Sequence, residues 1–205
     1  MYTGIVSHTL RPAEICRKPG LLTLSFMFDD ALLHGLELGA SVSVDGVCLT
    51  VAKIEGRKIS FDAMQETLDK TTLGMLNEQQ TCNIERSAIY GREIGGHLLS
   101  GHIDGRIEVE RVELFPHNHV IYFRVPEKLI PYLFEKGFVG LQGCSLTIAG
   151  LREEAGEFWV SLIPETLRRT NLGSLAKGSF VNIEIDRNTQ VIVDTLRRCF
   201  ERMQR

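Results

Sequence analysis

The sequence has no excess of charge of either sign and no long run of apolar residues. Its 205 residues include 23 Lys and Arg against 26 Asp and Glu, which gives a formal net charge of −3 at pH 7. A general nucleic-acid binder would show a basic excess or a basic stripe, and a membrane-spanning helix would need about 18 consecutive apolar residues. The sequence has neither, so we expect no nucleic acid and no membrane among its partners. With 43% hydrophobic and 24% charged residues, the composition excludes a disordered chain and indicates a soluble globular protein.

Signals for export and for structural cross-links are also lacking. Residues 1–6 contain no basic segment ahead of an apolar stretch, so no signal peptide is predicted. The five cysteines are widely spaced and form no C-x-x-C pair, which argues against a disulfide framework and a structural zinc site. The expected compartment is therefore a reducing cytoplasm. P-loop, G-x-G-x-x-G and H-E-x-x-H motifs are absent as well.

What the sequence does contain is an internal repeat. Four blocks recur in the same order at an offset of 97 to 99 residues: 3–6 with 100–103, 44–51 with 141–148, 65–74 with 164–173, and 83–85 with 182–184. A period of this length is too long for a solenoid. We therefore infer two tandem domains, 1–96 and 97–186, followed by a tail, 187–205.

Each repeat has the pattern of a small β-barrel. Short runs of β-branched and aromatic residues alternate with turn residues at a spacing of roughly 8–12, which is typical of an antiparallel barrel or sandwich. Closure of six strands would remove the exposed edges of so small a domain. Short helices are expected at 29–35 and 127–134, and single helical turns starting at 66–68 and 165–167. The predicted fold is thus all-β, with two tandem closed six-stranded barrels and short helices.

The tail has a helical pattern instead. Its apolar residues fall on one face of a helix: Ile192, Leu196, Cys199, Phe200 and Met203. An isolated helix of this length is only marginally stable in water, so it must pack on something. Docking on the chain's own barrels and self-association with other copies are both open at this point.

Matched positions of the two repeats differ in their chemistry. Cys48 in the first copy stands where the second copy has Ser145, and a thiol and a hydroxyl can both act as nucleophile, acid or hydrogen-bond donor. The second copy also carries Lys136 and Asp186 where the first has a leucine and a serine. These differences indicate either a division of labour between the copies or ordinary strand residues and solvated loop charges.

Histidines offer a further candidate. His102 follows Gly101, and glycine allows the backbone to approach a ligand closely. His102 is therefore either a ligand contact or a structural histidine with satisfied hydrogen bonds. His97 precedes it by five residues, and on a continuous strand the two rings would face opposite sides, so a shared metal ion is not expected.

Taken together, the motifs resemble those of the riboflavin synthase family (alpha chain) over essentially all of the chain. The resemblance rests on residues 1–6, 46–51, 95–105, 143–147, 163–167 and 181–186. It implies two six-stranded Greek-key barrels that each bind lumazine, and a C-terminal helix that holds a homotrimer. The implied reaction is the dismutation of two 6,7-dimethyl-8-ribityllumazine molecules, two per site, into riboflavin and 5-amino-6-ribitylaminouracil. No cofactor and no metal are implied.

The same resemblance assigns the site residues. Ser145, Cys48, His102, Asp186 and Lys136 would share the catalytic duties, with the single roles left open. The first substrate-binding surface would use Thr3, Gly4, Ile5, Ser41, Cys48, Leu49, Thr50, Asp62, Ala63, Met64, Gln65, Glu66 and Thr67. The second would use Gly101, His102, Ile103, Lys136, Ser145, Leu146, Thr147, Ser161, Leu162, Ile163, Pro164, Glu165 and Thr166.

Three positions depart from the family pattern. Gln142 replaces a common Asp, Cys144 replaces a usual Ile or Val, and Tyr2 replaces a common Phe. The first two are expected to border the site and to alter its packing. The alternative to an enzyme is a non-catalytic carrier of lumazine or flavin from the same superfamily. Because the catalytic candidates are all retained, the sequence favours the enzyme.

Overall fold

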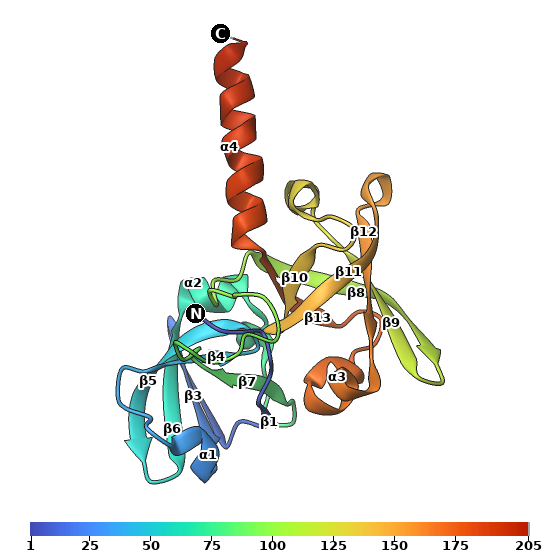
Figure 1. The fold of residues 1–205 in the computed structure, drawn as a ribbon. Helices are drawn as coiled ribbons and strands as arrows, with labels where there is room; N and C mark the ends of the chain where they lie inside the picture. The colour runs from blue at the N-terminus through green and yellow to red at the C-terminus, as the bar shows by residue number, and fades with distance from the viewer. Residues whose placement is uncertain (205) are drawn as a thin grey trace.

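The computed structural model describes residues 1–204 and shows two β-rich domains followed by a projecting helix (Figure 1). The N-terminal domain consists of β1 (His8–Leu10), β2 (Glu14–Lys18), β3 (Leu21–Met27), α1 (Asp30–Leu33), β4 (Ser41–Val44), β5 (Val47–Glu55), β6 (Lys58–Met64), α2 (Gln65–Lys70), η1 (Thr72–Met75) and β7 (Cys82–Arg86). The C-terminal domain consists of β8 (Gly105–Phe115), β9 (Asn118–Arg124), η2 (Glu127–Tyr132), β10 (Phe138–Leu141), β11 (Cys144–Arg152), η3 (Glu153–Ala155), β12 (Glu157–Leu162), α3 (Pro164–Arg169), η4 (Asn171–Ser174) and β13 (Phe180–Ile185). Helix α4 (Arg187–Met203) follows.

The C-terminal domain is the closed six-stranded barrel that the sequence predicts. Its strands follow the order β10-β11-β12-β9-β8-β13, and β13 pairs antiparallel with β10 to close the ring. β8 is long enough to serve two neighbours: its first half pairs with β13 and its second half with β9. A bulge between Val109 and Arg111 lies near the start of the part that pairs with β9, and bulges of this kind let a strand bend around a barrel.

The N-terminal domain differs from the predicted closed barrel. Its seven strands form an open sheet in the order β1-β7-β4-β5-β6-β3-β2. The two edge strands, β1 and β2, are consecutive in the chain, so the sheet curls until its edges are joined by residues 11–13. Pro12 lies in this connection and has no N–H to donate to a ladder. The long strand that closes the second barrel is therefore divided into two short strands in the first.

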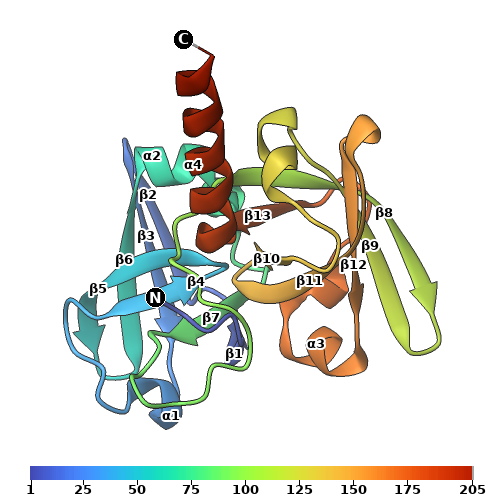
Figure 2. The same cartoon turned by 45° about the horizontal axis from the view of Figure 1, so that its top comes forward.

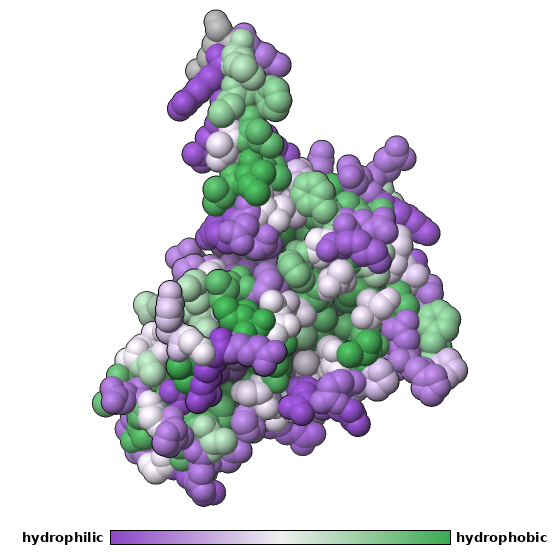
Figure 3. All heavy atoms as spheres, in the orientation of Figure 1, coloured by the Kyte–Doolittle hydropathy of each residue, from purple (hydrophilic) through white to green (hydrophobic). Residues whose placement is uncertain are grey.

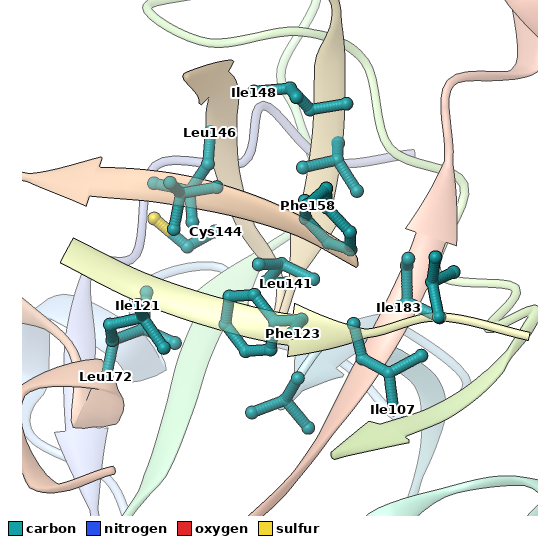
Figure 4. Close-up of a cluster of buried hydrophobic side chains, with 14 of the residues drawn as sticks. Ile107, Ile121, Phe123, Leu141, Cys144, Leu146, Ile148, Phe158, Leu172 and Ile183 are labelled. Carbon is teal, nitrogen blue, oxygen red and sulfur yellow. The ribbon is translucent and has the colours of Figure 1, made fainter. Parts of the chain in front are cut away.

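Each domain has its own apolar core, set by the alternation of buried and exposed positions along the strands. In β5, for example, Val47, Leu49 and Val51 are buried while Thr50 is exposed. Figure 4 shows the C-terminal core, where Phe123 and Phe158 stack with ring centroids 5.3 Å apart. Cys144 belongs to this core.

The two cores exchange one residue each. Val6, from the first repeat, is 4% exposed and packs in the core of the C-terminal domain. Ile103, its counterpart in the second repeat, is 5% exposed and packs in the core of the N-terminal domain. The segment that leads into each domain thus crosses to the other one, and neither core is complete without the other half of the chain.

Where the two domains meet, equivalent residues of the two repeats contact each other in a pseudo-twofold arrangement. Gly46 and Gly143 contact each other there, both in the left-handed region of φ. A Cβ atom on either glycine would lie 2.7 Å from the backbone nitrogen of the other, so no larger residue fits at this contact. This close approach accounts for the glycine at the same place in both repeats.

Reciprocal asparagine hydrogen bonds extend this interface. The side-chain amide of Asn83 donates to the backbone O of Gln142 at 2.9 Å, and that of Asn182 donates to the backbone O of Asp45 at 2.8 Å. Gln142 Oε1 also accepts from the Asn182 N–H at 2.9 Å, just as Asp45 Oδ1 accepts from the Asn83 N–H at 2.8 Å. Gln142 therefore performs the structural task of Asp45 at the domain interface.

Helix α4 projects away from both domains (Figures 1 and 2). Asp186 caps its first turn by accepting from the N–H groups of Asn188 and Thr189. The Tyr132 hydroxyl donates to Asp194 at 2.6 Å and ties the lower part of the helix to η2. No helix within residues 1–204 is long and apolar enough to cross a membrane.

Candidate active sites at Ser145 and Cys48

Ser145 lies near the start of β11 and is held through both its backbone and its side chain. Its N–H donates to the backbone O of Gly4 at 2.8 Å. Its Oγ lies 2.6 Å from Nδ1 of His97 and accepts from the His97 N–H at 3.1 Å. The His97 ring stacks on Phe138 with centroids 5.0 Å apart and planes 14° apart. The hydroxyl is thus fixed beside an imidazole with which it can exchange a proton.

The environment of His97 favours the neutral imidazole. The residue is 8% exposed, and burial lowers its pKa although the charge of Asp186 acts in the opposite direction. A neutral ring has one nitrogen free to accept a proton. Its Nε2 is buried and has no hydrogen-bond partner among residues 1–204. The Ser145–His97 pair is therefore suited to general base chemistry at neutral pH.

His97 is the functional candidate that the sequence analysis missed. The sequence contains one local signal for it, the glycine directly before it. A Cβ atom on Gly96 would lie 2.4 Å from the backbone O of Thr3 and 2.6 Å from Cβ of Ser145. Gly96 is thus required by the close packing of three segments around Ser145, whereas the sequence alone gave no reason to link His97 to a serine 48 residues away.

Cys48 occupies the equivalent place in the N-terminal domain. Its N–H donates to the backbone O of Gly101 at 2.9 Å. Gly101 has φ of +82°, and a Cβ atom there would lie 2.5 Å from Cβ of Cys48 and 2.8 Å from the ring of Tyr2. Tyr2 is buried, and this burial raises the pKa of its hydroxyl. The Cys48 site thus has a buried phenol where the Ser145 site has an imidazole.

Residues 3–6 and 100–103, which lead into the first and the second domain, are called the lead segments. Each lies at the site opposite to the one that the sequence predicted for it. Residues 3–5 were predicted to serve the Cys48 surface, and residues 101–103 the Ser145 surface. Instead, Gly4 bonds to Ser145 and Gly101 bonds to Cys48. The reason is the crossing of these segments between the domains, which a chain-order argument does not reveal.

Outward-facing residues of the strands extend both sites. In the N-terminal domain, Ser41 lies opposite Thr50, and Asp62 accepts a hydrogen bond from Thr23 Oγ1 at 2.7 Å. Met64, at the end of β6, is 64% exposed. The predicted residues on this outer face therefore form one strip across neighbouring strands, open to the outside of the sheet.

The C-terminal domain has the matching strip. Thr147 lies opposite Phe138 on neighbouring strands, and Ser161 points outward from β12. Ile163, which precedes α3, is 61% exposed. Both strips thus carry a large apolar side chain that has little cover within a single chain.

Five of the predicted contact residues have side chains buried in the domain cores. Four lie on strands, where the two-residue period turns them inward: Leu49, Ala63, Leu146 and Leu162. The fifth is Ile103, which precedes β8 and packs in the core of the N-terminal domain. Their side chains shape the strands from inside and do not face the outer strips.

The helical part of the predicted site lies on α2 and α3. Gln65 Nε2 donates to Asp69 at 2.7 Å, and Glu165 pairs with Arg168 and Arg169. The remaining predicted residues of these helices, Glu66, Thr67, Pro164 and Thr166, lie at their first turns.

Three predicted catalytic residues have looser surroundings than Ser145. His102 is exposed, and its N–H donates to Ser100 Oγ at 3.2 Å. Lys136 is exposed with φ of +65°, and its N–H donates to the backbone O of Ile148. Asp186 caps α4, and its hydrogen bonds help to lower its pKa. The charge of Asp186 acts on His97, so it bears on the Ser145 site through that ring.

No three His, Cys, Asp or Glu side chains within residues 1–204 lie together as ligands of a metal ion would.

The arrangement defines a class: a chain with two related domains whose equivalent outer strips surround Ser145 and Cys48. The Lumazine binding domain family matches it twice, over residues 3–87 and 100–186. Riboflavin synthase of Escherichia coli (strain K12) is 46% identical over 199 residues, covering 97% of this chain and 92% of that protein. Riboflavin synthase of Buchnera aphidicola subsp. Schizaphis graminum is 42% identical over 203 residues, covering 98% and 97%. The chain belongs to the riboflavin synthase family.

Solved structures give the same picture of the fold. LumP complexed with riboflavin superimposes with a TM-score of 0.82 and 28% identity, covering 91% of this chain and 100% of that one. LumP complexed with 6,7-dimethyl-8-(1'-D-ribityl) lumazine superimposes with a TM-score of 0.81 and 26% identity, covering 91% and 99%.

Proposed function

We propose that the chain is a transferase that dismutates two molecules of 6,7-dimethyl-8-ribityllumazine into riboflavin and 5-amino-6-ribitylaminouracil. The observation that carries this proposal is the identity of 46% to a riboflavin synthase over 97% of the chain. The duplicated site fits it, because two equivalent surfaces suit two identical substrates. One substrate loses the four-carbon unit that the other gains, so the reaction needs no external oxidant or reductant.

The Ser145–His97 pair supplies the base that this reaction requires. One lumazine must lose a proton from a methyl group before its carbon attacks the other molecule. The neutral His97 accepts a proton through or beside Ser145 Oγ, at the 2.6 Å contact between them. Cys48, His102, Lys136 and Asp186 remain candidates for the second site and for the addition to the ring carbon. Holding both molecules in place is itself a large part of the catalysis.

The proposed oligomer is a homotrimer built on α4. Its apolar side chains are exposed in the single chain, with Ile192 60%, Leu196 53% and Phe200 58% exposed, and Figure 3 shows apolar atoms along the helix. The outer strips around Met64 and Ile163 are also uncovered. Packing of neighbouring copies would cover both features and would bring the N-terminal strip of one copy to the C-terminal strip of another.

A reducing cytoplasm is the proposed compartment. All five cysteines lie within the described residues and are unpaired, and Cys16 and Cys199 among them are exposed. Exposed free thiols fit a compartment in which disulfides are rare.

The test is turnover of the pure protein. The chain is mixed with 6,7-dimethyl-8-ribityllumazine alone, and riboflavin is followed by its absorbance and fluorescence. We expect riboflavin to form with no additive, and with a metal chelator present. Tight binding of lumazine without turnover would instead identify a carrier, the function that the LumP complexes illustrate.

A further inference from the structure

Two buried glutamates at matched positions hold the two lead segments. Glu85, on β7, is 6% exposed. Its Oε1 accepts from the N–H of Thr3 at 2.6 Å and from the Thr3 hydroxyl at 2.7 Å, and its Oε2 accepts from the N–H of Gly4 at 3.1 Å. Backbone and hydroxyl donors compensate for the burial of this carboxylate, and the positive charge of the N-terminus also acts on it.

Glu184, on β13, repeats the arrangement in the second domain. It is 4% exposed, and its Oε1 accepts from the N–H and the hydroxyl of Ser100 at 2.6 and 2.7 Å. Its Oε2 accepts from the N–H of Gly101 at 3.0 Å. Each of these two carboxylates therefore acts as a clamp that accepts hydrogen bonds from two successive backbone N–H groups and one hydroxyl of a lead segment.

The clamped glycines continue into the sites of the opposite domains. The O of Gly4 accepts from Ser145, and the O of Gly101 accepts from Cys48, at 2.8 and 2.9 Å. The packing there leaves no slack, because a Cβ atom on either glycine would lie 2.5 Å from Cβ of Ser145 or Cys48. Hydrogen bonds thus link Glu85 through Gly4 to Ser145, and Glu184 through Gly101 to Cys48, so each glutamate is connected to the reactive residue of the other domain.

We propose that Glu85 and Glu184 are crossed positioning residues: Glu85 sets the geometry of the Ser145 site, and Glu184 sets that of the Cys48 site. That these glutamates affect turnover rests on the proposed function. That each glutamate positions the site of the other domain does not rest on it, because this concerns only which residue holds which segment. Each domain thereby supplies the support for the site on its neighbour.

The matched variants are Glu85→Gln and Glu184→Gln. Glutamine has the same shape, but one of its terminal atoms is a donor that faces an N–H group already donating. Each variant should therefore loosen one lead segment while the other stays clamped. Each also serves as the control for the other, since a general loss of stability would affect both sites alike.

Two measurements that need no turnover read the two sites. Alkylation of Cys48 by iodoacetamide, followed peptide by peptide with mass spectrometry, reports on the Gly101 segment. We expect E184Q to raise this rate by about tenfold, in line with the loss of hydrogen bonds to a charged group, and E85Q to leave it unchanged. The His97 ring resonances in NMR report on the Gly4 segment, and we expect them to shift in E85Q and to stay in E184Q.

Steady-state kinetics then tests the role in the reaction, with a fall in kcat expected for both variants. If riboflavin is not formed even by the unaltered chain, the crossed responses of Cys48 and His97 still decide the positioning proposal. An uncrossed response, or an equal response of both residues in both variants, would overturn it.

A milder pair covers the case in which the glutamine variants do not fold. Ser100→Ala and Thr3→Ala each remove one hydroxyl from a clamp without leaving a new buried donor. S100A should raise the reactivity of Cys48, and T3A should shift His97. The absence of both effects in folded protein contradicts the proposal.

Discussion

Replacing Ser145 by alanine removes the hydroxyl that holds His97 and leaves the Ser145 N–H bond to Gly4 in place. We expect riboflavin formation to fall by about 100-fold or more, the usual range for loss of a general acid–base partner. The unfolding temperature should stay close to that of the unaltered chain. Ser174→Ala is the control, because Ser174 donates only to the backbone O of Asn171, away from both sites. Turnover that is unchanged in S145A would remove Ser145 from the catalytic residues.

Asp45 makes a pH-dependent contribution to stability. Burial raises the pKa of this carboxyl to about 7 from an ordinary value of 3.8, although hydrogen bonds from Asn83 and Asn171 act in the opposite direction. The folded state therefore binds the proton more tightly than the unfolded state does. The stabilisation is complete below about pH 4 and is lost as the pH rises through 7.

Asp45→Asn should remove this dependence, because an amide already fills the equivalent position as Gln142. The free energy of unfolding of D45N minus that of the unaltered chain should increase by on the order of 2–4 kcal/mol when the pH is raised from 5 to 8. Urea unfolding of both proteins at the two pH values measures it, with the exposed Asp30→Asn as control. A difference between the two proteins that is the same at both pH values would show that Asp45 does not titrate in this range.

Among the elements, α4 has the surface that most needs a partner. Leu196 is 53% exposed, so its replacement by glutamate should disrupt packing between copies and leave each domain intact. Arg198→Glu is the matched control, because it introduces the same residue about 200° around the helix. We expect smaller particles in sedimentation velocity for L196E and unchanged ones for R198E. Deletion of residues 188–205 should likewise give monomers, and an intact trimer in either case contradicts the role of α4.

The two sheets differ because of single strands, β8 in one domain and the pair β1 and β2 in the other. The strand pattern of both repeats indicates a closed barrel, and β8 closes one by running continuously through its bulge. In the first repeat, the divided strand around Pro12 leaves the sheet open. Six-stranded closure was thus predicted correctly for one domain, and a single proline-containing connection accounts for the other.

The whole molecule depends on the exchange of Val6 and Ile103 between the cores. Ile103→Ala should weaken the N-terminal domain although it belongs to the second repeat, by about 2–5 kcal/mol as for other buried truncations. Val6→Ala is the reciprocal variant and should weaken the C-terminal domain. Hydrogen exchange followed by mass spectrometry separates the effects: I103A should increase exchange in β4–β6, and V6A in β10–β12. The opposite assignment would show that the crossing does not support the cores.

Much of this organisation was predictable because it follows local patterns. The repeat, the strand alternation and the apolar face of the tail depend on residues close together in the chain. The same patterns picked out Ser145 and Cys48 as matched positions. In the structure Thr50 and Thr147 are exposed, as the alternation of side chains along a strand requires for residues that follow buried ones.

Contacts between segments far apart in the chain could not be predicted from these local patterns. Strand alternation sets which face a residue occupies, but it carries no information on which segment covers that face. His97 reaches Ser145, and the lead segments exchange partners, because the domains pack through Gly46 and Gly143 and so draw residues 3–6 and 99–103 across the interface. The amino-acid pattern determines two similar sheets and a helix with one apolar face; the packing of those sheets against each other determines how the two sites are assembled.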